Sequence, residues 1–452
     1  MGLNWLADAE PETCWAHHPW TDFASLAQRE YAVAVLPVHG FAEHRAGCPV
    51  DLEELLGSHL LRQAVTLVGS RFPVRVLPPL RFVPAAAQRF FALGTDTADE
   101  LVREIAAGVK AAGLRKLVFL NTSPAHAPFV NTAALDARVG LGLRTYVIQA
   151  QSLGLDLGRH EAGDAAMLAP QLAGLLTEIR AHLAPPLAPV VGGPVPSAAP
   201  VPAPFPAYRA RYLPALSAAE LAALPAADRL LVILPTGAIE QHGPHLPVGV
   251  DAILGQALLA ATLPRLPSDL PVLVAPPLTY GKSNEHLGFP GTVTVSGRTL
   301  RRIVRAVAGQ LQAWGVRRLA LFNTHGGNSA VLTSLTREMP AGVDLTLLRP
   351  DTEPELDGPE AAWGFHAGEW ETSLMLACAP ELVHMDQAVA ESPVRPNDPG
   401  ALRPEHAPAT FAWMTRDISR HGVIGNPLTA TAEKGHRWMA TAADRLAAKI
   451  IG

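Results

Sequence analysis

The order of apolar and polar positions predicts strands alternating with helices. Short apolar runs at Leu230–Leu234 and Arg318–Phe322 each end at polar or glycine-containing loops, which is typical of buried strands. Leu, Ile and Val recur with helical spacing over Ala252–Thr262 and Thr299–Trp314. This alternation predicts an α/β layered domain with a mainly parallel sheet. In such domains, sites usually form in the loops at the carboxyl ends of the strands.

One segment departs from this pattern. Residues 185–206 read PPLAPVVGGPVPSAAPVPAPFP. Proline at this density removes backbone donors and favours an extended chain, so a helix or a sheet interior is not expected there. We therefore predict two domains, at residues 1–184 and 208–452, joined by a Pro/Ala-rich linker at residues 185–207.

The two predicted domains resemble each other in sequence. VAVLPVHGFAEHRAGCPVDLEELLG, from Val33 to Gly57, aligns without gaps with LVILPTGAIEQHGPHLPVGVDAILG, from Leu231 to Gly255. Further along, GLRKLVFLNTS at residues 113–123 matches GVRRLALFNTH at residues 315–325. Two unrelated α/β domains would share strand chemistry, but not a constant offset over about 40 positions. A tandem duplication is therefore the favoured interpretation.

Composition narrows the class of protein. The 452 residues are 48% hydrophobic and 17% charged, which is typical of a globular enzyme rather than a disordered chain. The formal net charge of -5 does not favour nucleic acid or an anionic membrane as a partner. Three cysteines without paired spacing, no secretory signal pattern and no apolar run of membrane-spanning length lead us to expect a cytoplasmic protein.

The first group of candidate functional residues follows the strand at Leu230–Leu234. Glu240 and His242 are two positions apart, so an extended chain projects them to the same side, and Asp251 returns from the start of the next helix. Carboxylates and imidazoles that converge after a strand can hold a divalent cation, and an aspartate that bridges can hold two. The alternative is that Asp251 caps the helix and the histidines, His245 included, are hydrogen-bonded loop residues.

Two further groups follow later in the chain. NTHGGN, at residues 323–328, presents His325 after a strand, and its glycines permit the backbone to approach a ligand closely, which makes Gly326 a candidate for substrate binding. In HAGEWETS, at residues 366–373, Glu371 is a candidate metal ligand and His366 a candidate proton carrier. Alternatively, NTHGGN is a phosphate-binding loop, and Glu371 only marks the start of a helix.

Two residues outside these groups are weaker candidates for substrate contacts. Ser283 lies in a polar loop at residues 281–286, where a lone serine is more often simply solvated. Trp363 precedes His366 and either stacks on a flat substrate or belongs to the core. Taken together, three acid and histidine groups after successive strands predict a two-metal site that hydrolyses a C–N bond.

These motifs resemble the creatininase (creatinine amidohydrolase) family. The resemblance rests on LPTGAIEQHGPHLPVGVD, GKSNEHLGFPGTVTVS, NTHGGN, HAGEWETSLMLA and GVIGNPLTATAEKG, and it covers residues 208–452. It implies an α/β fold, two divalent ions such as Zn, Mn or Fe, and commonly a hexamer. It also implies that Glu240 and His325 bind one metal, His242 binds the other, Asp251 bridges them, and His366 is the acid/base.

One position departs from creatininase itself. That enzyme carries an acid two residues after the NTHGGN-type histidine, where this chain has Gly327, so Glu371 is the candidate for the remaining ligand. Relatives with HGGN include a formamide hydrolase and a peptidase that trims a redox-cofactor precursor. The resemblance therefore implies an amidohydrolase that cleaves a cyclic or linear amide with a metal-bridged hydroxide. A peptidase, a formamide hydrolase and a non-catalytic scaffold in a maturation pathway are the alternatives.

The N-terminal half resembles the same family more weakly. Ala42 stands at the Glu240 position, Glu53 at the Asp251 position and Ser123 at the His325 position, whereas His44 matches His242. Since each ligand carries a large share of site affinity, we predict a degenerate copy without metal. It is expected to occupy the position of a dimer partner, while His39, Glu43, His44 and His126 leave open an unrelated metal site. A homo-oligomer is a further expectation.

Overall fold

A computed structural model of the chain describes residues 12–26, 29, 31–69, 72–84, 90–159, 164, 167–182, 209–224, 227–339, 342–391, 402–403, 409–410 and 412–452. The linker predicted at residues 185–207 lies outside them. The described part contains two four-stranded parallel sheets, with orders β2-β1-β3-β4 and β6-β5-β7-β8. The predicted α/β class with parallel sheets is confirmed, and the same strand order occurs in both halves.

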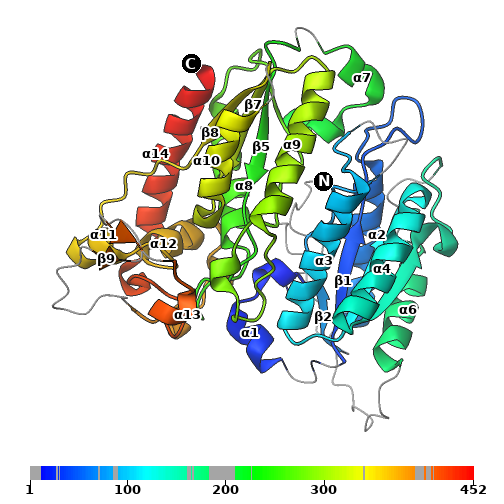
Figure 1. Cartoon of the computed structure of the whole chain (residues 1–452), viewed down its shortest axis with the longest axis horizontal. Helices are drawn as coiled ribbons and strands as arrows, with labels where there is room; N and C mark the ends of the chain where they lie inside the picture. The colour runs from blue at the N-terminus through cyan, green and yellow to red at the C-terminus, as the bar shows by residue number, and fades with distance from the viewer. Residues whose placement is uncertain are drawn as a thin grey trace.

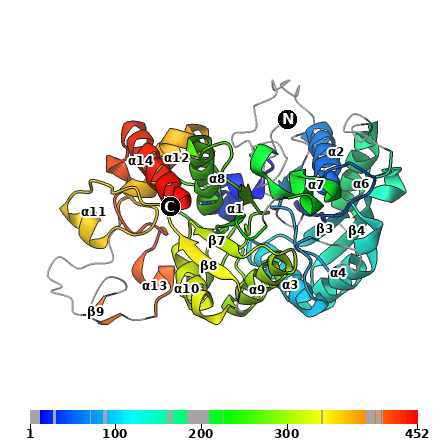
Figure 2. The same cartoon turned by 90° about the horizontal axis from the view of Figure 1, so that it is seen from above.

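The N-terminal sheet is built from short apolar strands that are covered on both faces. Its strands are β1 (Val33–Val38), β2 (Val74–Val76), β3 (Lys116–Asn121) and β4 (Arg144–Gln149). Helices α2 (Leu52–Val68) and α6 (Ala169–Ala181) pack together on one face, and α3 (Thr95–Ala111) and α4 (Ala127–Leu141) pack together on the other (Figure 2). Both central strands are fully buried, as parallel strands under two helical layers must be.

The C-terminal sheet has the same layers. Its strands are β5 (Leu231–Thr236), β6 (Val272–Val274), β7 (Arg318–Asn323) and β8 (Asp344–Leu348). Helices α8 (Val250–Thr262), α12 (Glu369–Cys378) and α14 (Ala432–Ile451) cover one face, and α9 (Gly297–Ala313) and α10 (Ser329–Glu338) cover the other (Figures 1 and 2). The remaining described elements are α1 (Trp20–Ser25), α7 (Ala218–Ala222), α11 (Gly358–Trp363), α13 (Thr415–Ile418), β9 (Leu402–Arg403) and β10 (Ala409–Thr410).

The predicted strands and helices of the C-terminal half are confirmed, with shifts of one or two residues at their ends. One shift matters for the site. Helix α8 begins at Val250 rather than Ala252, with Gly249 at its N-cap. Asp251 therefore lies inside the first turn, with a buried side chain, and is not the residue that caps the helix.

The two halves exchange backbone hydrogen bonds in matching pairs. A short segment before each sheet pairs with the loop after the first central strand of the other sheet. The four N–H···O bonds are Val248 to His18 (2.9 Å), Gly249 to Ala16 (2.9 Å), Val50 to Leu216 (3.1 Å) and Asp51 to Pro214 (3.0 Å). Each bond from one half corresponds to a bond from the other at an offset of 198 positions (248 − 50 and 214 − 16). The contact is thus reciprocal, as in an isologous dimer interface.

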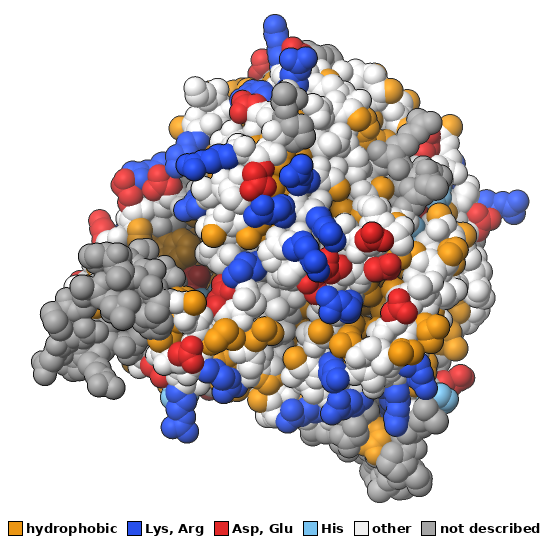
Figure 3. Space-filling model, in the orientation of Figure 1, with side chains coloured by type: hydrophobic (Ala, Val, Ile, Leu, Met, Phe, Trp, Pro, Cys, Tyr) orange, Lys and Arg blue, Asp and Glu red, His pale blue; other side chains and the backbone are white. Residues whose placement is uncertain are grey.

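Helices α3 and α9 lie side by side where the two halves meet (Figures 1 and 2). Gly108 on α3 allows the segment before α9 to approach closely, because a Cβ there would lie 3.0 Å from the Cα of Val293. The Gln310 side chain accepts a hydrogen bond from Ala92 N at 2.9 Å and donates to its carbonyl oxygen. Charged side chains of both signs are interspersed over the face seen in Figure 3. An ion pair between Arg302 of α9 and Glu100 of α3, at 3.1 Å, joins the two helices. Among the described residues, none of the helices combines the length and the hydropathy that crossing a bilayer requires.

Candidate metal centre

The loop after β5 directs two ligand candidates to one point. The Ile239–Val293 bridge and a hydrogen bond from Glu240 N to Val248 O (2.9 Å) keep the loop extended where Glu240 and His242 project. Gly243 then turns the chain with φ +71°, a conformation that favours glycine. Both ligand candidates are buried, so the loop presents them to the interior rather than to solvent.

Side chains from four segments meet at the carboxyl ends of β5 and β7. The Nε2 atom of His242 lies 3.7 Å from Glu371 Oε1, 3.8 Å from Asp251 Oδ1 and 3.9 Å from Glu240 Oε1. The Nδ1 atom of His325 lies 3.3 Å from Glu240 Oε1 and 3.4 Å from Asp251 Oδ2. The five residues predicted as metal ligands therefore come together, which the sequence had indicated only motif by motif.

Each histidine is held so that one ring nitrogen faces the cluster. His242 Nδ1 is 3.0 Å from the Glu240 carbonyl oxygen, and His325 Nε2 is 2.9 Å from the Lys282 carbonyl oxygen. Since a carbonyl only accepts, these nitrogens carry the protons, and the opposite nitrogens, His242 Nε2 and His325 Nδ1, are left as bases. This is the arrangement that second contacts impose on metal-binding histidines.

Several buried polar atoms of the cluster have no hydrogen-bond partner in the described part of the chain and are suited to bind a cation. Among the described residues, three buried atoms of the cluster have no hydrogen-bond partner: Glu240 Oε2, His242 Nε2 and Asp251 Oδ2. Two groups with ligand atoms within 4.8 Å of one another, His242–Asp251–Glu371 and Glu240–Glu285–His325, include most of the cluster. Burying carboxylates without partners is costly, and a divalent cation removes that cost.

The close packing of buried carboxylates and histidines also shifts the pKa values of these groups. Burial lowers the pKa of a histidine, yet the carboxylates of Glu371, Asp251 and Glu240 raise the pKa of His242 to about 9. Against the same effect of burial, Glu240 and Asp251 raise the pKa of His325 to about 10. Burial and the neighbouring charge of Glu240 raise the pKa of Asp251 well above its usual value. The shifts arise because several carboxylates and histidines share one small buried space, an arrangement that suits a bound cation.

His366 lies against this cluster. Its ring stacks between those of His242 and His286, with centroids 4.4 and 4.3 Å away. Its Nε2 donates to the Gln241 carbonyl oxygen at 2.8 Å, and its Nδ1 lies 3.8 Å from Glu240 Oε1. Burial, followed by the charge of His242, lowers its pKa to about 4.

A strained turn sets the spacing of His366 and Glu371. Ala367 between them has φ +52°, which is uncommon for a residue with a Cβ. The Ala367 N–H donates to Glu371 Oε2 at 2.5 Å. Left-handed backbone at a non-glycine residue persists only where its surroundings impose it, and it is concentrated at functional sites.

The three residues predicted to contact substrate differ in their surroundings. Ser283 is buried, with its Oγ 3.2 Å from His325 Nε2, so the structure connects it to a ligand candidate. Gly326 is exposed, and a Cβ there would meet nothing within 4 Å. Trp363 is half-buried at the end of α11, whereas another aromatic residue, Trp413, lies edge-on to His286 at 6.3 Å. Their roles in substrate binding stay predictions.

Sequence reasoning missed three residues of the cluster. His286 Nε2 lies 3.4 Å from Glu240 Oε1, Gln241 donates from its side chain to Gly422 O at 3.0 Å, and Glu285 approaches His325. The polar run Asn284–Glu285–His286 in a loop facing the site was the available signal. His245, in contrast, is turned to Thr372, with Nε2 2.9 Å from the hydroxyl.

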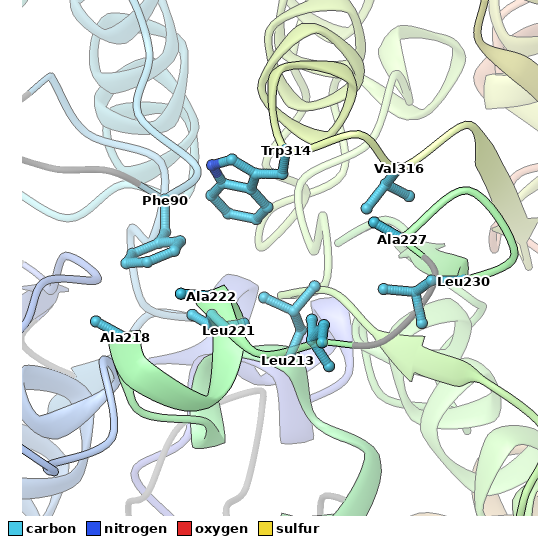
Figure 4. A pocket seen from close by; sticks show the side chains of 10 residues that line it. Phe90, Leu213, Ala218, Leu221, Ala222, Ala227, Leu230, Trp314 and Val316 are labelled. Carbon is cyan, nitrogen blue, oxygen red and sulfur yellow. The ribbon is translucent and has the colours of Figure 1, made fainter.

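An apolar pocket elsewhere is not part of this cluster. It has a volume of about 270 Å³ and lies between the halves, with Phe90, Trp314 and Leu213 in its wall (Figure 4). Leu230 and Val316, which also line it, precede β5 and β7, so the pocket lies near the amino ends of the strands. None of the described residues that line it is acidic or a histidine.

Comparison with known proteins identifies the family. The model described as creatininase, creatinine amidohydrolase, matches residues 16–171 and 214–450, which is most of the chain and includes part of each half. The chain belongs to the creatininase family. It is a hydrolase of the class of metal-dependent amidohydrolases that act on C–N bonds.

Several relatives and solved structures are similar to about half of the chain. The mycofactocin precursor peptide peptidase of Mycolicibacterium smegmatis is 31% identical over 230 residues, which cover 49% of this chain and 84% of that protein. The creatinine amidohydrolase of Pseudomonas putida is 33% identical over 248 residues, covering 48% and 86%. A creatinine amidohydrolase structure from Bacteroides fragilis is 28% identical with a TM-score of 0.41, covering 49% and 88%. A structure named Creatininase Mn is 27% identical with a TM-score of 0.41, covering 53% and 97%.

Proposed function

We propose that the C-terminal half binds two divalent cations and uses them to hydrolyse an amide. The observation that carries this proposal is the position of Asp251. Its Oδ1 faces His242 and its Oδ2 faces His325, as a bridging carboxylate requires. His325 and Glu240 would be the other ligands of one ion, and His242 and Glu371 would be the other ligands of the second ion.

Bound divalent ions would polarise the amide carbonyl and make water a competent nucleophile at neutral pH. The chain itself contributes position and proton transfer. His366 is fixed through the Gln241 carbonyl, with its other ring nitrogen toward Glu240, so it is the group we assign to pass a proton to the leaving nitrogen. Gln241 also contacts His286, so it holds the His286 and His366 rings in position relative to each other.

For the substrate we propose a linear amide, peptides included, ahead of creatinine. The basis is Gly327, which stands where creatininase itself carries an acid. Relatives at a similar level of identity are named both as a precursor peptide peptidase and as a creatinine amidohydrolase, so both classes belong in one screen.

For the N-terminal half we propose a duplicated, degenerate copy that takes the place of a partner subunit. The support is the reciprocal exchange of hydrogen bonds at one offset, together with the pairing of α3 and α9. The carbonyls of Ala16 and His18 hold Gly249 and Val248, at the end of the loop that carries Glu240. The copy would thereby brace the catalytic loop. Among the described residues, every candidate metal group lies in the C-terminal half.

The test is elemental analysis of the purified chain and of His242→Ala, together with turnover of a panel of peptides, formamides and creatinine. We expect about two metal equivalents per chain, as in two-metal hydrolases, and fewer in the variant. About four equivalents would contradict the degenerate copy. Bound metal without turnover of any amide would contradict the substrate class, and no metal after incubation with Zn²⁺ or Mn²⁺ would contradict the centre itself.

A further inference from the structure

A further carboxylate reaches the centre from the loop after β6. Glu285 lies in the single turn Asn284–His286 and is half-buried. With Glu240 and His325 it forms one of the groups whose ligand atoms lie within 4.8 Å of one another. Its two oxygens have different surroundings. Oε2 is 3.0 Å from Lys282 Nζ, and Oε1 is turned toward the His325 ring, 3.9 Å from Nε2.

The space for this carboxylate is kept open by a glycine. A Cβ at Gly327 would lie 2.1 Å from Glu285 Oε1 and 2.5 Å from His325 Nε2. It would also lie 2.5 Å from the Lys282 carbonyl oxygen, so the close approach of that backbone also requires a glycine here. Gly327 is not among the glycines with positive φ, so backbone conformation is not the reason for a glycine here. Any side chain at this position would displace the carboxylate of Glu285 from the cluster.

The charges around Glu285 also favour a cation beside it. Lys282 balances one oxygen, but the pair lies beside the buried carboxylate of Glu240, whose Oε2 has no hydrogen-bond partner among the described residues. A second carboxylate so close to Glu240 adds repulsion unless a cation lies between them. An ion at Glu240 and His325 removes that repulsion and would gain an oxygen ligand.

We propose that Glu285 is a ligand of the ion held by Glu240 and His325, in space that Gly327 leaves free. This inference rests on the proposed two-metal centre, and it adds a ligand that the motifs alone did not identify. Glu285→Gln keeps the shape of the side chain but removes its charge. Lys282→Met breaks the same ion pair but leaves the carboxylate in place.

The experiment is a Co²⁺ titration of the metal-stripped full-length chain, read by competition with a chelator and by d–d absorption. We expect Glu285→Gln to bind one Co²⁺ at least about tenfold more weakly and with a changed absorption, because a charged carboxylate ligand becomes a neutral and weaker amide ligand. Lys282→Met should bind Co²⁺ as tightly as the wild type or more tightly, because a positive charge near the ion is removed. Urea unfolding of each variant verifies that it is folded, and Glu285→Asp, which keeps the charge with a shorter reach, should fall between the wild type and Glu285→Gln.

Three results would overturn the inference while leaving the metal centre intact. These are wild-type affinity in Glu285→Gln, equal weakening in both variants, and weaker binding with an unchanged d–d spectrum. The last result would assign Glu285 to a position outside the coordination shell. A wild-type chain that binds no Co²⁺ would instead remove the proposed centre and this inference with it.

Discussion

The carboxyl ends of the two sheets have the same backbone arrangement, but their buried carboxylates differ in whether their oxygens have hydrogen-bond partners. In the C-terminal half, Glu240 and Asp251 each keep an oxygen without a hydrogen-bond partner among the described residues. In the N-terminal half, Glu53 stands at the Asp251 position, and both of its oxygens are bonded. Oε2 accepts from Gly40 N at 2.6 Å, and Oε1 lies 2.8 Å from His44 Nε2.

Glu54, the residue after Glu53, is a second buried carboxylate of the N-terminal half that has a partner within the protein. Glu54 is buried and paired with the buried Arg81 at 2.7 Å, so its charge is balanced inside the fold. A buried ion pair of this kind balances the carboxylate with a cation of the protein itself rather than with a bound ion. The comparison teaches that one fold either pairs its own buried acids or leaves some of their oxygens for a cation. Among the described residues, the cluster's carboxylate oxygens without hydrogen-bond partners, rather than the mere presence of acids and histidines, distinguish the candidate site.

The largest expected effect is the loss of Asp251. Asp251→Ala should lower turnover by at least about three orders of magnitude and release metal, because the bridging ligand of both ions is gone. The matched control is Glu53→Gln at the equivalent position, which should leave metal content unchanged. Elemental analysis and amide turnover measure both. Full activity in Asp251→Ala, or metal loss in Glu53→Gln, would reverse the assignment of the two halves.

A smaller effect is expected where the N-terminal half balances its own charge. Arg81→Met should lower the free energy of unfolding by about 3–5 kcal/mol, since it leaves Glu54 buried without its partner. Urea unfolding measures this, and adding Glu54→Leu should restore much of the loss. A cost under about 1 kcal/mol would show that the pair is not needed for stability.

The pH dependence of the same variant follows from the pKa of Glu54. Burial raises that pKa, but the Arg81 guanidinium holds it below its usual 4.5. The stabilisation from the pair is therefore complete above about pH 4.5 and is lost as pH falls toward the lowered pKa. The difference between wild type and Arg81→Met should be largest at neutral pH and shrink in acid.

The smallest expected effect is at the junction between the halves. In Gly249→Ala, the new Cβ would lie 2.5 Å from the Ala16 carbonyl oxygen, so the segment must shift. We expect a loss of about 1–3 kcal/mol in unfolding free energy, and weaker Co²⁺ binding because Asp251 is in the next turn. Gly309→Ala, with nothing within 4 Å of its Cβ, is the matched control and should be neutral or slightly stabilising. Unchanged Co²⁺ affinity in Gly249→Ala would show that the N-terminal half does not brace the centre.

Local patterns carried much of the prediction. Strands β5 and β7 and helices α8 and α9 lie within two residues of their predicted positions, because burial on both faces produces continuous apolar runs, and one-sided burial produces helical spacing. The convergence of Glu240, His242, Asp251, His325 and Glu371 was also expected, since parallel strands bring their following loops to one edge.

Other features depended on the tertiary structure. Glu285 and His286 come from a loop after an edge strand, and only packing brings them to Glu240 and His325. Trp413, from a segment more than 120 positions along the chain, lies edge-on to His286 at 6.3 Å.

The sequence by itself determined the elements, the family motifs and the repeat, since each is written in residues close together along the chain. Only the tertiary structure decided which buried charges are balanced, which glycine makes room for Glu285, and how Ala16 and His18 hold the loop of the other half. The physical reason is that these contacts join residues far apart in the chain. Their energy depends on the distance and desolvation that the packed loops impose, and no local period records either.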